Sequence, residues 1–232
     1  LLRSWYSGDW GYRTILTIAS TKVSTLSPAR VKDFPVYINM SDLPASFWNA
    51  VQGQGDIVIT AGDGFTKLPR EILSFVNNFD GSGSGELWFK APLLTNLENN
   101  YFYIYYGNAM APEVNKPPKV WSNGYVGVWH LNDSNFTDSS PNPAANGAGT
   151  AITMASGSLI GNYVSFNGTS SFIRVTTSSK FDVTGTCTLS AWIRPSLTAS
   201  QMYVLSKRTG ATNGYDMSTG ISGTMYYTYS GS

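Results

Sequence analysis

The amino-acid sequence predicts an all-β protein built from two tandem β-sandwich domains. Short segments alternate between apolar and polar residues, and clusters of Gly, Pro, Asn or Asp bound them, as is typical of strands. Only 12% of the residues are charged, against roughly 25% in soluble proteins, so the solvent-facing sides of helices would be hard to build. At 232 residues the chain fits two modest domains or one large sandwich.

The first half is dominated by segments with the period of a strand. In the opening segment, Tyr12, Thr14, Leu16 and Ile18 lie on one side of the chain, with Ile15 on the other. The predicted strands cover residues 12–18, 34–38, 56–60, 68–75, 86–90 and 101–106. A helix of one or two turns is expected over residues 46–51, after start signals at residues 41–44.

A proline-rich stretch divides the chain. Residues 110–119 hold three of the 11 prolines and show no alternation, so we predict a first domain over 1–110, a linker over 111–119 and a second domain over 120–232. Strands are expected in the second domain at 125–131, 163–166, 172–176, 186–194, 202–207 and 224–229. Residues 135–150 are rich in Asn, Ala, Gly, Ser and Pro, and we expect a long loop there.

Five ordered landmarks in the first half carry a family resemblance. They are residues 10–18 (WGYRTILTI), 34–39 (FPVYIN), the set 56–60, 63–64 and 68–72 (DIVIT, DG, LPREI), 87–92 (LWFKAP) and 104–108 (IYYGN). Residues 5–110 thereby resemble the small β-sheet domain of unknown function 2341, which occurs in bacterial, archaeal and phage surface proteins. The resemblance implies a β-sandwich and carries no activity of its own.

The second half resembles the opening strands of a laminin G-like, concanavalin A-like jelly roll. The matching segments are 127–131 (GVWHL), Asp138-Ser-Ser-Pro-Asn142, 164–168 (VSFNG), 172–175 (FIRV) and 189–195 (LSAWIRP). Such domains usually continue well beyond this length. The resemblance therefore implies that residues 120–232 form an incomplete sandwich, belonging to a longer protein or completed by strands from elsewhere.

Charge and hydropathy exclude two classes of partner. The formal net charge is +1, and the Lys and Arg residues are scattered without a dense basic block, so nucleic acid is not expected as a partner. No apolar run approaches the roughly 20 residues that cross a bilayer, so no membrane insertion is expected. The single Cys187 cannot form an internal disulfide.

No catalytic residues are predicted, although concanavalin A-like folds also include glycosidases, which use two carboxylates. The Glu-x-Asp-x-x-Glu strand of the laminarinase type is absent from the sequence. Glu71 and Glu86 are candidates for a pair across the first sheet, but we expect ordinary solvated side chains. His130 is the only histidine, and a hydrogen-bonded structural role is favoured over catalysis or zinc binding. Cys187 shares the apolar side of its predicted strand, which favours a small core residue.

Calcium is the one cofactor that the sequence suggests. Asp133, Asp138 and Asn142 lie close together at the start of the long loop, and laminin G-like domains often hold calcium near the rim of the sandwich. The alternative is that these residues turn and end loops without any metal.

Exposed aromatic rings with polar neighbours would suit a glycan, because a sugar ring has both apolar and polar surfaces. Trp192 and Arg194 share the more polar side of their predicted strand, and Tyr226 and Tyr227 lie near the end of the chain. The alternative is that these rings pack in the core, which is the favoured interpretation for Trp192.

These expectations combine into a non-enzymatic binding or adhesion module at an extracellular, cell or virion surface, which recognises glycans or surface proteins. One alternative is a structural or decorating component of a fibre, capsid or appendage, with other copies or subunits as partners. Another is an accessory fragment of a polysaccharide-degrading enzyme.

Overall fold

The structure, a computed structural model, describes residues 5–23, 29–111, 115–141, 146–157, 160–176, 178–183, 185–196, 200–209, 213–220 and 224–230. Antiparallel strands dominate it, and the prediction of an all-β protein is confirmed. The chain divides into two compact units, one of residues 1–143 with 153–165, and the other of residues 144–152 with 166–232. In the described part, no helix is long and apolar enough to span a bilayer.

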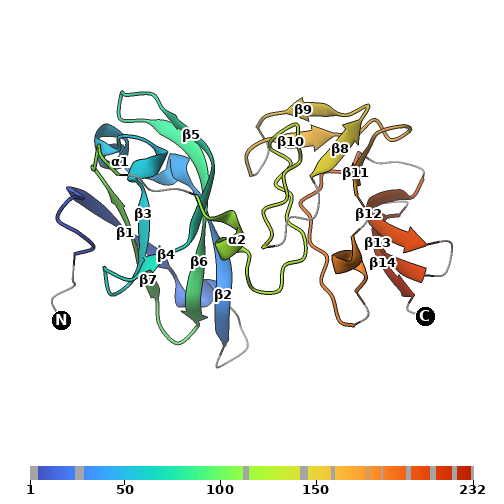
Figure 1. Cartoon of the computed structure of the whole chain (residues 1–232), viewed down its shortest axis with the longest axis horizontal. Coiled ribbons are helices and arrows are strands. Elements are labelled where there is room, and N and C mark those ends of the chain that lie inside the picture. Colours follow the sequence, from blue (N-terminus) through green and yellow to red (C-terminus); the bar gives the residue numbers. More distant parts are fainter. Residues whose placement is uncertain are drawn as a thin grey trace. The chain divides into compact units, whose positions relative to one another are not determined.

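The first unit contains two antiparallel sheets (Figure 1). One has the order β1-β7-β3-β4, and the other has the order β2-β6-β5. Their strands are β1 (Tyr12–Ile18), β2 (Arg30–Asn39), β3 (Val58–Ala61), β4 (Lys67–Leu68), β5 (Arg70–Asn77), β6 (Gly83–Thr95) and β7 (Asn100–Tyr106). Each strand predicted in this half is present, and β1 has the predicted bounds.

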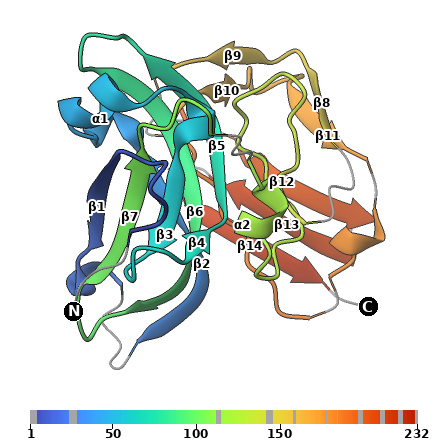
Figure 2. The same ribbon diagram turned by 60° about the vertical axis from the view of Figure 1, so that its left-hand side comes forward.

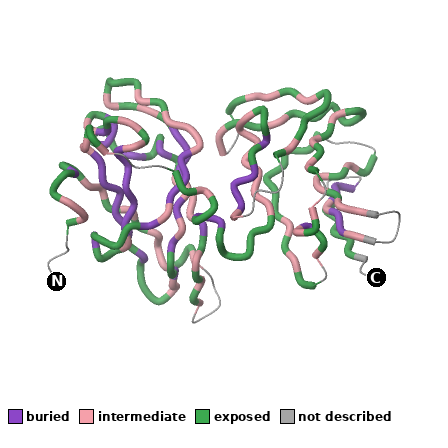
Figure 3. Tube along the Cα trace, in the orientation of Figure 1, coloured by how far each residue is buried: buried purple, intermediate pink, exposed green. Residues whose placement is uncertain are grey.

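The core of the first unit lies between the facing sides of these sheets. Ile59 and Ile104 come from one sheet, and Leu87 and Phe89 come from the other, and all four belong to one buried cluster. The helix α1 (Ala45–Ala50) adds Phe47 and Trp48 to this cluster, as its predicted position suggested. Figure 3 shows the buried positions gathered along these strands. The alternation in the sequence therefore marks true inward-facing positions here.

The expected linker is partly ordered onto the first unit. The short helix α2 (Pro117–Val120) has prolines in its first turn, where the missing N–H groups cost nothing. Asn115 accepts from the backbone N–H of Ile72 and donates to its carbonyl, and Val120 is fully buried. The first compact unit thus extends past residues 111–119, where the sequence places the division.

The prediction of a strand over residues 125–131 is wrong. This segment makes only one isolated antiparallel bridge, between Trp129 and Asp138. The first unit also contains a small ribbon of β9 (Thr153–Ala155) and β10 (Tyr163–Ser165), of which β10 was expected.

The second unit holds a three-stranded sheet and a two-stranded ribbon. The sheet has the order β12-β13-β14, and Figure 2 shows its strands side by side. Its members are β12 (Met202–Thr209), β13 (Asn213–Thr219) and β14 (Met225–Ser230), and the ribbon pairs β8 (Gly147–Thr150) with β11 (Phe172–Val175). The sequence did not predict β13, and β8 occupies the end of the expected long loop.

The predicted strand over residues 186–194 is also wrong. The described residues 185–196 contain no strand, although Cys187 and Leu189 alternate with exposed neighbours as the residues of a strand would. Alternation describes only the two sides of a chain, whereas a strand also needs a neighbouring backbone to complete its hydrogen bonds. Within the described part of the chain, no ladder forms with this segment.

Candidate functional site

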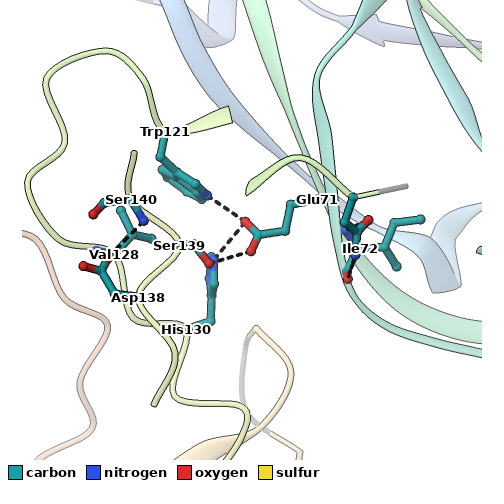
Figure 4. Close-up of polar contacts among 9 residues, drawn as sticks. Glu71, Ile72, Trp121, Val128, His130, Asp138, Ser139 and Ser140 are labelled. Atoms are coloured by element: carbon teal, nitrogen blue, oxygen red, sulfur yellow. Dashed lines mark hydrogen bonds and ion pairs between the residues drawn. The ribbon is translucent and has the colours of Figure 1, made fainter. Parts of the chain in front are cut away.

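The carboxylate of Glu71 is the centre of a buried polar cluster in the first unit (Figure 4). It accepts hydrogen bonds from the indole N–H of Trp121 at 2.7 Å and from the hydroxyl of Ser139 at 2.6 Å. Nε2 of His130 lies 3.2 Å from the same carboxylate. β5 supplies Glu71, and the chain that follows α2 supplies the other three residues. The hydrogen bonds of Glu71 therefore hold residues 121–139, a segment without regular structure, against the sheet.

The prediction of a hydrogen-bonded His130 is confirmed, since it contacts Glu71 and has little exposed side chain. The geometry differs from a serine–histidine–acid relay. In such a relay the histidine accepts the serine proton, whereas here the Ser139 hydroxyl donates directly to Glu71. The arrangement holds its members in place and leaves Ser139 directed at a carboxylate.

A second carboxyl group, that of Glu86, lies on the adjacent strand β6. Its hydroxyl partner is Ser74, at 3.3 Å, and the two residues are cross-strand neighbours. Burial raises the pKa of Glu86, and the Ser74 hydrogen bond and the nearby His130 offset only part of this shift. The Glu86 carboxyl group also lies close to Gly161, so that a Cβ at residue 161 would overlap it. The backbone of Gly161 has φ +57°. A side chain at residue 161 would require the Glu86 carboxyl group to move, and the positive φ there also favours glycine.

The expectation that Glu71 and Glu86 are solvated is therefore wrong, because their exposed fractions are 3% and 7%. Aromatic rings pack together beside Glu71. The Trp88 ring lies 5.1 Å from the Trp121 ring and 5.9 Å from the His130 ring, measured between centroids. No sequence pattern predicted this cover, because α2 and the segment after it belong to the part expected to be a linker and a second domain.

The residues predicted for calcium have other partners in the structure. The carboxylate of Asp138 accepts from the backbone N–H groups of Val128 and Ser140, and it is buried. Asp133 accepts from the N–H of Asn135 and is partly exposed, as in a loop-turning role. Asn142 lies outside the described residues. Across the described ranges, no group of three or more His, Cys, Asp or Glu side chains is placed to hold a metal, and calcium stays a prediction.

The second unit contains an open pocket of about 330 Å³ beside β14. Its walls are Cys187, Thr188, Leu189, Met217, Met225, Tyr226 and Tyr227, and none of these residues is charged. Met217 and Tyr227 are directly paired across β13 and β14, so their side chains share one face of the sheet. Tyr226 and Tyr227 are about half exposed, at 50% and 52%. The two predicted tyrosines thus meet at one surface site.

Cys187 lines this pocket, so the prediction that it is a core residue is wrong. Its Sγ lies 3.1 Å from the hydroxyl of Tyr227, and the residue is only partly buried. This hydrogen bond is the main reason that the pKa of Tyr227 rises to about 12. The hydroxyl of Tyr227 is a neutral polar group next to an apolar ring, as tyrosine hydroxyls are at physiological pH.

The favoured interpretation of Trp192 as a core residue is wrong, since 77% of it is exposed. Arg194 is exposed as well. Neither residue is a wall of the pocket beside β14. The described residues 185–196 form no ladder, so no sheet holds the Trp192 ring against a second layer.

Sequence reasoning missed the apolar and polar partners of the two tyrosines. Met217 lies on β13, which was not predicted, and Met225 begins β14 at the edge of the sheet. Thr188 and Leu189 come from the irregular segment, so their proximity to β14 depends on tertiary folding. The alternation of Met225, Tyr227 and Tyr229 was the only local signal of this face.

Comparisons with protein-family models, with curated proteins and with solved structures found no match for this chain.

Proposed function

We propose that the chain is a non-catalytic binding module of an extracellular, cell-surface or virion-surface protein, and that its second unit binds glycans. The observation that carries the proposal is the uncharged pocket beside β14. The side chain of Tyr227 is half exposed there, and it brings both an aromatic ring and a hydroxyl to the pocket. Apolar faces of sugar rings stack on aromatic rings, and their hydroxyls need nearby polar groups.

The chemistry of the pocket wall supports a neutral ligand. Met217, Met225 and Leu189 give it apolar surface, while Thr188 and Tyr227 bring hydroxyls. An anionic ligand such as a phosphate would be expected to meet Arg, Lys or a cluster of backbone N–H groups. A neutral sugar residue of a surface polysaccharide fits the wall better.

A glycan array with the purified chain tests the proposal. We expect binding to neutral glycans and a loss of affinity of about tenfold or more in Tyr227→Ala, because ring stacking is removed. Tyr203→Ala is the matched control, since Tyr203 lies on the same sheet, is 59% exposed and is not a wall of the pocket.

Two further variants test which residues bind the glycan. Trp192→Ala removes the other exposed ring that the sequence suggested, and we expect it to leave the affinity unchanged. Measuring binding with and without a chelator, and in Asp133→Ala, tests whether binding depends on calcium. No binding to any glycan on a broad array, or equal losses of affinity in Tyr203→Ala and Tyr227→Ala, would contradict the proposal.

A further inference from the structure

The strand β14 presents a hydrogen-bonding edge that is open among the described residues. It pairs with β13 on one side, from Met225 opposite Thr219 to Ser230 opposite Gly214. On its other side, no described residue pairs with it. Alternate backbone N–H and C=O groups along this strand therefore point away from the sheet and can bind another strand.

The other outer strands of the three- and four-stranded sheets carry features that discourage such pairing. β12 has Lys207, Arg208 and an irregular register between Tyr203 and Leu205. In the first unit, β1 contains Arg13, β2 contains lysine and proline, β4 contains Lys67, and β5 has an irregular register. Charges, prolines and bulges are the usual means of protecting an edge.

β14 has none of these features in its six residues, MYYTYS. It has no charge, no proline and no glycine, and its register with β13 is regular. Tyrosine and threonine also favour strands. A short segment with high strand propensity and no charge is prone to pair with another chain wherever it is left uncovered.

We propose that this edge pairs with the β14 edge of a second copy of the chain, in an antiparallel arrangement related by a two-fold axis. An axis at Tyr227 places Tyr227 opposite Tyr227 of the second copy, and Met225 opposite Tyr229. The uncharged strand is self-complementary, because no like charges meet and aromatic pairs form across the junction. The inference goes beyond glycan binding, since it uses the backbone edge of β14.

Such pairing joins β12, β13 and β14 of two copies into one six-stranded sheet. The rings of Tyr227 and Tyr229 from both copies then lie along one face of that sheet, and the rings of Tyr203 and Tyr226 lie along the other. A second copy is the occupant that the strand itself supports, because its own sequence supplies the complementary edge.

Sedimentation velocity over a concentration series tests the proposal on the full chain. We expect a concentration-dependent dimer, and in Tyr227→Lys a dimer dissociation constant raised by about tenfold or more, because two ammonium groups would then face each other. Tyr203→Lys is the matched control and keeps the dimer, since it adds the same charge to the opposite, already charged edge. Far-UV circular dichroism of each variant establishes that the sheet is folded.

Hydrogen exchange of the β14 amides, with and without dilution, separates the possible occupants. Protection that is lost on dilution supports pairing between copies. A monomer at every concentration overturns the proposal, and a monomer with protected β14 amides assigns the edge to another segment of the same chain. A dimer that persists in Tyr227→Lys but dissociates in Tyr203→Lys would place the contact at β12 instead, and would also overturn it.

Discussion

The two units differ in that the first encloses a large cluster of aromatic rings, whereas the second exposes several rings on one sheet. In the first, rings such as Phe47, Phe89 and Phe102 lie in one buried cluster that both sheets and α1 enclose. In the second, Tyr203, Tyr226 and Tyr227 are each at least half exposed on a single sheet. The same local alternation thus makes a core where two sheets face each other, and a surface where the rings of one sheet stay exposed.

Burial in the second unit also has a different chemical character. Its central strand β13 buries Asp216, Ser218 and Thr219 beside Tyr215. Asp216 has Nη1 of Arg208 within 3.1 Å. The buried residues of the first unit are mostly apolar, whereas the described part of the second buries a larger share of polar side chains. Substitutions in the two units should therefore change the free energy of unfolding by different amounts.

The largest expected effect comes from the apolar core of the first unit. Phe89→Ala should destabilise that unit by about 3–5 kcal/mol, because it removes a fully buried ring and leaves a cavity. Urea unfolding followed by tryptophan fluorescence measures the change. Tyr203→Ala in the second unit and Phe79→Ala, at an 87% exposed position of the first, should each cost less than about 0.5 kcal/mol. A similar loss of stability in all three variants would contradict the proposed difference between the buried core of the first unit and the exposed rings.

A smaller loss of stability is expected when Glu71, a buried polar residue of the first unit, is replaced. Glu71→Gln should cost about 2 kcal/mol, because a side-chain amide turns its own N–H groups toward one or more of the donors whose hydrogen bonds Glu71 now accepts. Hydrogen exchange should show faster opening of residues 121–139 than of β6. Glu98→Gln, at an exposed position, serves as the matched control. Unchanged exchange in Glu71→Gln would show that the carboxylate does not hold this segment.

The smallest effect depends on pH and concerns Glu86. Its pKa is raised in the folded protein, so the folded state favours the protonated form. The wild-type protein should then lose stability as pH rises from the ordinary value of 4.5 through the raised value. Glu86→Gln stays neutral, so its melting temperature relative to wild type should increase between about pH 4 and pH 7. A difference between the two proteins that is constant with pH would argue against a buried, desolvated carboxyl group.

The sequence predicted the strands before residue 110 more accurately than those after residue 120, for a physical reason. Residues 12–18 alternate, and residues 101–106 are a continuous run of aromatic and apolar residues, as in a central strand that is covered on both faces. The two segments are neighbouring strands in the structure. Residues 125–131 and 186–194 alternate just as clearly, yet neither forms a ladder with any described segment. The backbone partner that decides between strand and loop is distant in sequence, and alternation carries no information about it.

The candidate site shows the same division. Tyr226 and Tyr227 were identified from the sequence, because a run of tyrosines on an alternating strand predicts rings on its faces. Their neighbours Met217 and Leu189 were not, since one lies on an unpredicted strand and the other on an irregular segment. Trp192 was named as a candidate for glycan binding, with packing in the core as the favoured interpretation because of its size, and the structure exposes it.

By itself, the sequence determined the all-β class and the strands of the first sandwich, because composition and alternation are local properties of the chain. Only the tertiary structure decided that Glu71 and Glu86 are buried, that Trp121, His130 and Ser139 fasten to Glu71, and that no described segment covers the edge of β14. These features depend on which distant segments lie side by side. Burial, hydrogen-bond partners and free edges are all set by that choice of neighbours.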